Sequence, residues 1–465
     1  MTPPAPTPRP AAPKTAPKAA APAAQAPPKP TALHWGILAV VALLAVGLRL
    51  VDPLGDPVLA TEKPFLEMGQ AWDFVQGDGP PTGYALVLAP FALMGTDALY
   101  AAARFLPAVL GAVGVVGAFF LARRFMHPAG AITAALLAAI IPELIVRGSG
   151  LFQPTLDLAL LPWLLLGTLR LAQGHWKGAL LAAPIALVML MSNPGFMALL
   201  LPTLAVVGAV AGAHFAPKAR VAIGVAGGVA ALALLWLAVA GPLAPGTVPE
   251  PGEVELLSQL TIPALLFALA GAIVAVVRPS PYGWVALTFT ATAAAATLLL
   301  TAGDPALKVA YLGYGIALLA AVPVSETFRV VGDARPQAQT STTFGVLALS
   351  TILTLPAGMG LDPWYRLYDE NELHAYDALG DLAPATVISG SWQAQVGYHA
   401  LTGGAVQYNP DFFHDDGIRA YELERDPRLV VLVDQHAKDD GIPPGFLESW
   451  QKVGQWGSTV AYKAP

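Results

Sequence analysis

Long apolar runs separated by short polar segments make up most of the chain. The first run, His34–Val51, is long enough to cross a bilayer as a helix, because a crossing takes about 20 predominantly apolar residues. Further runs of membrane length occur near residues 99–121, 129–146, 155–171, 178–192, 196–213, 221–241, 260–277, 283–301, 306–323 and 342–358. The pattern predicts a multi-span α-helical membrane protein with about eleven transmembrane helices.

A long polar segment, residues 52–98, separates the first two of these runs. It contains one shorter apolar stretch, Tyr84–Met94, which is too short to cross a bilayer. We therefore expect residues 84–94 to form an interfacial helix inside a long outer loop.

Composition excludes a water-soluble globular protein. Apolar side chains make up 55% of the residues and charged ones only 12%, and the mean hydropathy is +0.59. Soluble domains carry about 25% charged residues. The chain has no cysteine, which excludes disulfide bonds and thiolate metal sites.

Charge placement predicts the orientation in the membrane. Residues 1–32 are rich in proline and alanine and carry only basic charges, so we expect a disordered cytoplasmic tail; its length argues against a cleaved signal peptide. With this tail inside, the inner segments collect the bases Arg123, Arg124, Arg170, Lys177, Lys218, Arg220, Arg278, Arg329 and Arg335. The outer loops collect acids instead. A membrane domain over 33–359 with an odd number of spans places the remaining residues outside the cytoplasm.

Residues 360–465 have the composition and the alternating apolar and polar pattern of a soluble domain, with an excess of acids. Strands are expected at Ala385–Ser389, Ala405–Tyr408, Arg428–Asp434 and Thr459–Lys463, and helices at Trp364–Leu379, Trp392–Leu401, Asp416–Arg425 and Phe446–Val453. The alternation predicts an extracytoplasmic α/β domain with a largely parallel sheet. Ligands of such sheets meet the loops at the carboxyl ends of the strands, which points to Ser391 and Trp392.

The outer loop VLATEKPFLEMGQAWDFVQGDGPPTGYALVLAPFALMG (58–95) resembles the first extracytoplasmic loop of GT-C membrane glycosyltransferases. It is most similar to family 39, the dolichyl-phosphate-mannose-type enzymes, and more distantly to the oligosaccharyltransferase catalytic subunit. The matching positions are Thr61-Glu62, Phe65, Leu66, Met68, Gly77, Pro80-Pro81, Gly83 and Tyr84. Residues 103–125 and 128–157 continue the likeness, which covers roughly residues 34–215.

The resemblance implies transfer of a sugar from a polyprenyl-phosphate donor to a protein, lipid or glycan acceptor on the extracytoplasmic side. Glu62 would be the catalytic carboxylate, and Arg147, with Lys63 and Arg49 beside it, would bind the donor phosphate. Further groups near the reaction or the acceptor would be Asp157, Gln153, Glu143, Ser391 and Trp392. The partners implied are the lipid bilayer, the lipid-linked donor and the acceptor, without nucleic acid.

Two departures from the family pattern concern the metal and the acceptor. Thr61 stands where the family has an aspartate, and Gln153 stands where oligosaccharyltransferase-like proteins have one. SGSWQAQVGY (389–398) occupies the place of their Trp-Trp-Asp-Tyr-Gly motif, and the histidines of the chain lack metal-ligand spacing. We therefore expect a metal-independent monosaccharide transfer without a cofactor, and the resemblance implies that it proceeds with inversion.

Two other functions remain open. A transporter or flippase would share the many spans, although transporters often show paired repeats and the sequence shows none. A non-catalytic scaffold descended from such transferases would explain the departures at Thr61 and Gln153.

Overall fold

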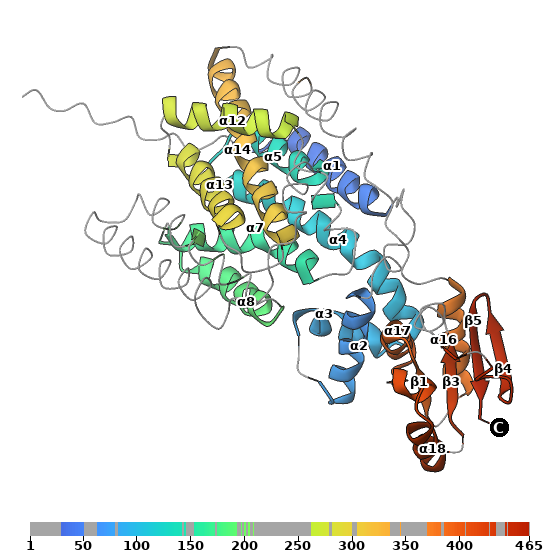
Figure 1. The fold of residues 1–465 in the computed structure, drawn as a ribbon. Helices are drawn as coiled ribbons and strands as arrows, with labels where there is room; N and C mark the ends of the chain where they lie inside the picture. The colour runs from blue at the N-terminus through green and yellow to red at the C-terminus, as the bar shows by residue number, and fades with distance from the viewer. Residues whose placement is uncertain are drawn as a thin grey trace, which may run out of the picture.

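A bundle of apolar helices occupies one end of the molecule and a small sheet with its helices occupies the other (Figure 1). The computed structural model describes residues 29–50, 63–79, 82–141, 144–145, 153–172, 174–192, 197, 200, 203–204, 208, 262–278, 281–299, 305–334, 345, 370–382, 386–404, 406–426, 428–433, 442–443 and 445–464. The two parts are joined through the first long loop, which lies against both.

The bundle helices follow the apolar runs of the sequence. They are α1 (Ala32–Leu50), α4 (Thr96–Ala122), α5 (Pro128–Ile140), α7 (Gln153–Ala172), α8 (Lys177–Ser192), α12 (Ile262–Val277), α13 (Pro281–Leu299) and α14 (Pro305–Ala334). Within the described residues, four helices are long and apolar enough to cross a membrane, at 32–50, 96–122, 155–172 and 309–330. The expected runs 221–241 and 342–358 lie outside the described residues except for position 345, so the count of eleven stays a prediction.

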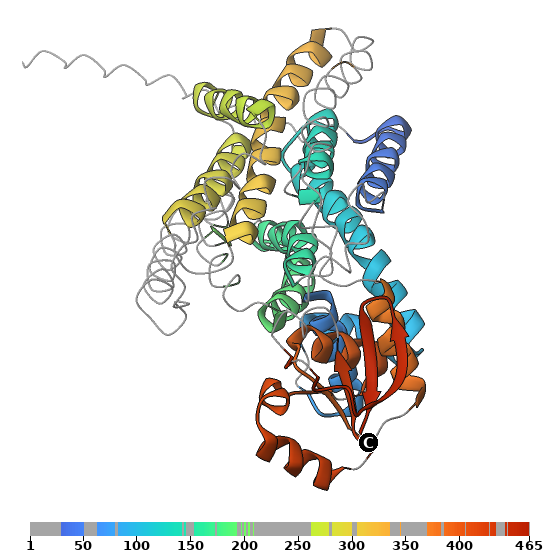
Figure 2. The same cartoon turned by 45° about the vertical axis from the view of Figure 1, so that its right-hand side comes forward.

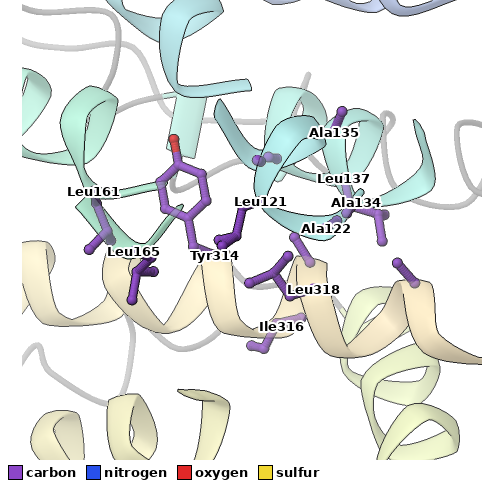
Figure 3. Close-up of a cluster of buried hydrophobic side chains, with 14 of the residues drawn as sticks. Leu121, Ala122, Ala134, Ala135, Leu137, Leu161, Leu165, Tyr314, Ile316 and Leu318 are labelled. Atoms are coloured by element: carbon purple, nitrogen blue, oxygen red, sulfur yellow. The ribbon is translucent and has the colours of Figure 1, made fainter. Parts of the chain in front are cut away.

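The centre of the bundle is built from four helices, α4, α5, α7 and α14. Leu121 of α4, Ala134 of α5 and Leu165 of α7 meet Tyr314 and Leu318 of α14 in one cluster of buried side chains (Figure 3). The small alanine side chains of α5 let the neighbouring helices approach closely, as is usual where helices pack inside a membrane. Residues 309–322 of α14 are all buried, so this stretch forms the core of the bundle.

The loop between α1 and α4 contributes α2 (Lys63–Gln76) and α3 (Gly83–Ala92). Helix α3 confirms the short helix expected at 84–94, and its ten residues are too few to cross a bilayer. Thr82 begins it, because the Thr82 hydroxyl accepts a hydrogen bond from the Ala85 backbone N–H at 3.1 Å.

The C-terminal part contains a five-stranded sheet in the order β2-β1-β3-β5-β4. Its elements are α16 (Glu370–Leu382), β1 (Val387–Ser389), α17 (Trp392–Thr402), β2 (Val406–Tyr408), the 3-10 helix η2 (Pro410–Phe413), α18 (Asp416–Arg425), β3 (Val430–Val433), β4 (Gln451–Trp456) and β5 (Thr459–Lys463). All four expected strands are confirmed, as are the helices at 392–401 and 416–425. Of the helix expected at 364–379, the part before residue 370 lies outside the described residues.

Two expectations for this sheet were wrong. The helix expected at Phe446–Val453 is a turn followed by strand β4, and the sheet is mixed rather than largely parallel, since β5 pairs antiparallel with both β3 and β4. The reason lies in Gly457, whose φ of 57° suits the tight turn Gly457-Ser458 between β4 and β5. That hairpin supplies the antiparallel half of the sheet.

The sheet domain docks on the first loop through α17 and α2. Phe65, Met68 and Ala71 of α2 are buried in one hydrophobic cluster with Tyr398 and Leu401 of α17. The Trp72 indole N–H donates to the Ala400 carbonyl at 2.9 Å, and His399 Nε2 lies 3.0 Å from Asp73 Oδ1. These contacts place the loop and the sheet domain at the same end of the bundle, as both views show (Figure 2).

The start of α1 lies at the opposite end. Trp35 packs on Phe119 near the end of α4 with 5.6 Å between ring centroids, whereas Leu99 and Ala103 near the start of α4 join the cluster with the sheet domain. Helix α4 has 27 residues, and at about 1.5 Å per residue it separates these two ends by roughly 40 Å. Residues 1–28 of the expected tail lie outside the described residues, so the sides on which the tail and the C-terminal domain lie stay predictions from the charges.

Candidate functional site

Buried polar side chains gather where α2, α3, α7 and α8 meet, at the end of the bundle that contacts the sheet domain. The group consists of Glu67, Tyr84, Thr155, Asp157 and Ser192, all of which are buried. Polar groups in such surroundings cost free energy unless they are compensated, and ionisable ones at membrane depth are functional candidates by default. We call these five residues the polar junction.

Local structure explains how the polar junction forms. Gly83 opens α3, and a Cβ atom at this position would overlap the Ser192 hydroxyl and come within 3.0 Å of the Val188 carbonyl. The missing side chain lets the start of α3 lie directly on α8, so that Tyr84 points inward beside the first turns of α7. Burial of Phe65 and Met68 fixes the face of α2 and brings Glu67 to the same place.

Two carboxylates share the polar junction. Asp157 is fully buried, and neither of its oxygens has a hydrogen-bond partner among the described residues. Asp157 and Glu67 interact electrostatically, and both also act on the Tyr84 hydroxyl, which lies near Thr155. Two carboxylates that act on each other in a buried site disfavour two full negative charges. The polar junction can therefore take up a proton where the helix bundle meets the first long loop.

Tyr84 remains a neutral phenol in this setting. Burial raises the pKa of Tyr84 well above its ordinary value, and the Glu67 carboxylate raises the pKa further. The folded state thus disfavours the phenolate, so the associated stability is full below the unfolded pKa of about 10 and is lost as the pH rises above it.

The replacement Tyr84→Phe tests this ionisation. We expect the melting temperature of the wild-type protein to fall more steeply than that of Tyr84→Phe between about pH 10 and pH 11, because only the wild type must keep this phenol neutral. Thermal unfolding in detergent at a series of pH values measures the difference. Parallel curves for the two proteins would show that Tyr84 is not held neutral by burial.

Arg49, one of the expected phosphate-binding residues, lies in the last turn of α1 and is buried. Its guanidinium donates to the backbone carbonyls of Ala45 at 3.0 Å and Leu144 at 2.8 Å. Gly111 of α4 makes the space for it, since a Cβ atom there would overlap the Arg49 side chain. Arg49 therefore ties α1 to the segment after α5, and the polar junction does not include it.

The remaining expected site residues fall into three groups. Glu62, Glu143 and Arg147 lie outside the described residues, and Lys63 and Gln153 begin α2 and α7 with side chains that are not described. Ser391 is buried and caps α17, accepting from the Ala394 N–H at 3.2 Å. Trp392 is 45% exposed beside Tyr408. Of the expected residues whose side chains the structure describes, Asp157 alone lies in the polar junction.

Glu67 and Ser192 are two members of this group that the sequence did not predict. In the sequence, Glu67 is one of several acids in a loop that is expected to be solvated. Ser192 is the last residue of an apolar run, where a polar residue is ordinary. A usable signal was the spacing of Phe65, Met68 and Ala71, because a helix that buries these positions turns Glu67 toward the bundle.

The two carboxylates of the polar junction are too few to form a metal site by themselves. No group of three or more His, Asp or Glu side chains that could hold a metal ion occurs within the described ranges. Glu62 lies beyond these ranges, so a metal-independent reaction stays a prediction.

Comparisons with known proteins bear on the fold. No protein-family model and no curated protein sequence matches the chain. Among solved structures, the apo form of the Archaeoglobus fulgidus oligosaccharyltransferase is similar over 93% of this chain and 74% of that one, with 12% identity and a TM-score of 0.58. The same enzyme, AglB, in complex with an inhibitory peptide and a dolichol-phosphate gives a TM-score of 0.57 at 12% identity.

A second neighbour matches from end to end. ArnT from Cupriavidus metallidurans, bound to undecaprenyl phosphate, is covered over 98% of its length by 93% of this chain, with 13% identity and a TM-score of 0.54. The chain has the GT-C fold. This confirms the resemblance inferred from the outer loop, although identities this low show the GT-C fold and not the activity.

Proposed function

We propose that this protein transfers a sugar from a polyprenyl-phosphate donor to a protein, lipid or glycan acceptor on the extracytoplasmic side. The GT-C fold carries the proposal, because it extends over 93% of the chain and is shared with a protein bound to undecaprenyl phosphate and with one bound to a dolichol-phosphate. The polar junction supports it, since it places carboxylates where the bundle meets the outer loop.

The proposed reaction is a single displacement at the anomeric carbon. Glu62 takes the proton of the acceptor hydroxyl as the acceptor oxygen bonds to that carbon, and the bond from the carbon to the donor phosphate oxygen breaks. The sugar is transferred with inversion and polyprenyl phosphate leaves. Arg147, with Lys63, neutralises the negative charge that develops on this phosphate, because a guanidinium binds phosphate through two hydrogen bonds.

The polar junction positions the reacting loop in this proposal. Glu67 and Tyr84 follow Glu62 in the same loop, and Asp157 lies on α7 against both. Their mutual contacts hold the outer loop against the membrane helices. No metal or cofactor takes part in the proposed step.

The replacement Asp157→Asn tests the proposal. We expect sugar transfer to fall at least about tenfold, because the neutral amide cannot share a proton with Glu67 and its N–H groups would alter the contacts of the loop. Membranes containing the protein are incubated with a labelled polyprenyl-phosphate sugar, and the labelled product is separated and counted. Melting temperature and protein yield report whether the fold is kept.

Asp78→Asn is the matched control, because Asp78 is an exposed acid in the same loop. It should keep wild-type transfer. Equal activity of Asp157→Asn and wild type would remove Asp157 from the site. A wild-type protein that forms no product from any polyprenyl-phosphate sugar would favour the non-catalytic scaffold instead.

A further inference from the structure

Basic side chains gather at the end of the bundle opposite the sheet domain. Arg123 and Arg124 directly follow α4, Arg170 lies in the last turn of α7, and His34 lies near the start of α1. These four side chains come from three helices, and α1 and α7 both pack on α4. The polar junction at the other end of the bundle shares none of them.

The arginines of this cluster repel one another. Burial lowers the pKa of Arg123, and the neighbouring Arg124 lowers it further; burial also lowers the pKa of Arg124, and Arg170 adds to that effect. Arg124 and Arg170 form no ion pair with a described residue, and the buried Nε of Arg170 has no hydrogen-bond partner in the same part of the chain. The carboxyl ends of α4 and α7 attract cations only weakly. The cluster therefore favours an added anion.

Aromatic side chains of the same three helices lie next to this cluster. Trp35 of α1 packs on Phe120 of α4 with ring centroids 6.0 Å apart, and Phe120 packs on Trp163 of α7 at 5.7 Å. Trp163 lies directly on α4 because Gly117 has no side chain there, and its N–H donates to the Val113 carbonyl at 3.0 Å. Trp35 is 45% exposed. An aromatic surface thus runs from α1 across α4 to α7.

The surface continues along α4 toward the middle of the bundle. Val113 and Val109 are exposed and lie about two and three turns beyond Phe120, away from the arginines. From Arg124 to Val113 the helix extends about 16 Å at 1.5 Å per residue, which matches one leaflet, half of a hydrocarbon core about 30 Å thick. A cationic end and an apolar surface on the same three helices suit one amphipathic anion.

We propose that Arg124 and Arg170 bind the phosphate of an anionic phospholipid whose acyl chain lies on Trp35, Phe120 and Trp163. Guanidinium groups bind phosphate through paired hydrogen bonds, and basic positions between transmembrane helices are typical lipid-headgroup sites. Arginines that only extend toward the lipid headgroups would lie apart from one another. Here Arg124 interacts electrostatically with both Arg123 and Arg170, so the three side chains form one group. This site is independent of the proposed transfer reaction.

Lipid binding to the full-length protein in a neutral detergent tests the site. Native mass spectrometry measures the affinity for phosphatidylglycerol, phosphatidylcholine and, as a soluble anion, inorganic phosphate. We expect the wild type to prefer phosphatidylglycerol, and the double variant Arg124→Gln/Arg170→Gln to bind it at least tenfold more weakly. Trp35→Ala keeps the charge of the protein and should also weaken phosphatidylglycerol binding, because it removes part of the apolar surface.

The double variant Arg278→Gln/Arg329→Gln is the matched control. It removes the same charge from the ends of α12 and α14, near the pocket of about 310 Å³ lined by Arg278 and Glu326. This control should keep phosphatidylglycerol affinity. Equal losses in both double variants would show general surface attraction and overturn the proposal. The proposal would also be overturned if Trp35→Ala and the Arg124/Arg170 double variant both bound phosphatidylglycerol as tightly as the wild type. Inorganic phosphate binding as tightly as the lipid would overturn it as well.

Discussion

Sugar transfer falls by about 10²- to 10⁴-fold in the variant Glu62→Gln if Glu62 accepts the proton of the acceptor, because that is the usual contribution of a positioned general base. Glutamine has nearly the same shape and cannot accept this proton. The donor should still bind, since the proposed phosphate partners are unchanged. Transfer from a labelled polyprenyl-phosphate sugar in membranes gives the rate, and retention of the labelled donor gives the binding.

Two further variants define the role of this carboxylate. Glu62→Asp keeps the charge and should recover part of the lost rate. Glu253→Gln removes an acid from another predicted outer loop and should leave transfer unchanged. Wild-type transfer in Glu62→Gln would show that another group takes the proton, and Asp157 or Glu67 would be the next to replace.

A single methyl group at Gly271 should destabilise the helix bundle by about 1–3 kcal/mol, the usual cost of overpacking a well-packed interior. Gly271 lies where α12 crosses α14, and a Cβ atom there would overlap the Leu319 carbonyl oxygen and fall 2.8 Å from the Leu319 carbonyl carbon. Backbone atoms cannot rotate away as a side chain can. In Gly271→Ala the two helices must separate, which lowers the midpoint of thermal unfolding in detergent.

Gly47→Ala serves as the control for this effect. Gly47 lies in α1, and a Cβ atom there would meet nothing within 4 Å. Alanine in a helix is more stable than glycine by roughly 0.5–1 kcal/mol, so this variant should melt at or slightly above the wild-type temperature. Equal effects of the two replacements would contradict the close crossing of α12 and α14.

The helices of the bundle were predictable because hydrophobic length is a local property of the chain. The apolar run predicted at 178–192 begins one residue after α8 begins. The first predicted run begins two residues after α1 begins. The hairpin of β4 and β5 was missed, although Gly457-Ser458 is a turn signal, because the apolar positions of Phe446–Val453 also fit a helix. Pairing with β5 decided that part of this segment forms a strand and not a helix. That contact is not visible in the local pattern of Phe446–Val453.

The candidate site was predictable only in part. Asp157 was expected near the reaction because of the resemblance, and the structure buries it where α7 meets α2 and α3. Glu67 reached the same place because the burial of Phe65 and Met68 sets the rotation of α2. The cluster of Arg124 and Arg170 was expected only as a general excess of bases, since its members lie 46 positions apart in the sequence.

Hydropathy along the chain was enough to predict a membrane protein, to locate most ends of the described bundle helices and to identify the loop that carries the polar chemistry. Those properties follow from hydrophobicity and chain length, which each segment has on its own. Helix packing in three dimensions was needed to dock the sheet domain on α2, to bring helices into direct contact at Gly83 and Gly271, and to gather Glu67, Tyr84 and Asp157 in one buried site. These features depend on how helices rotate against each other, and such packing is a property of pairs of distant segments.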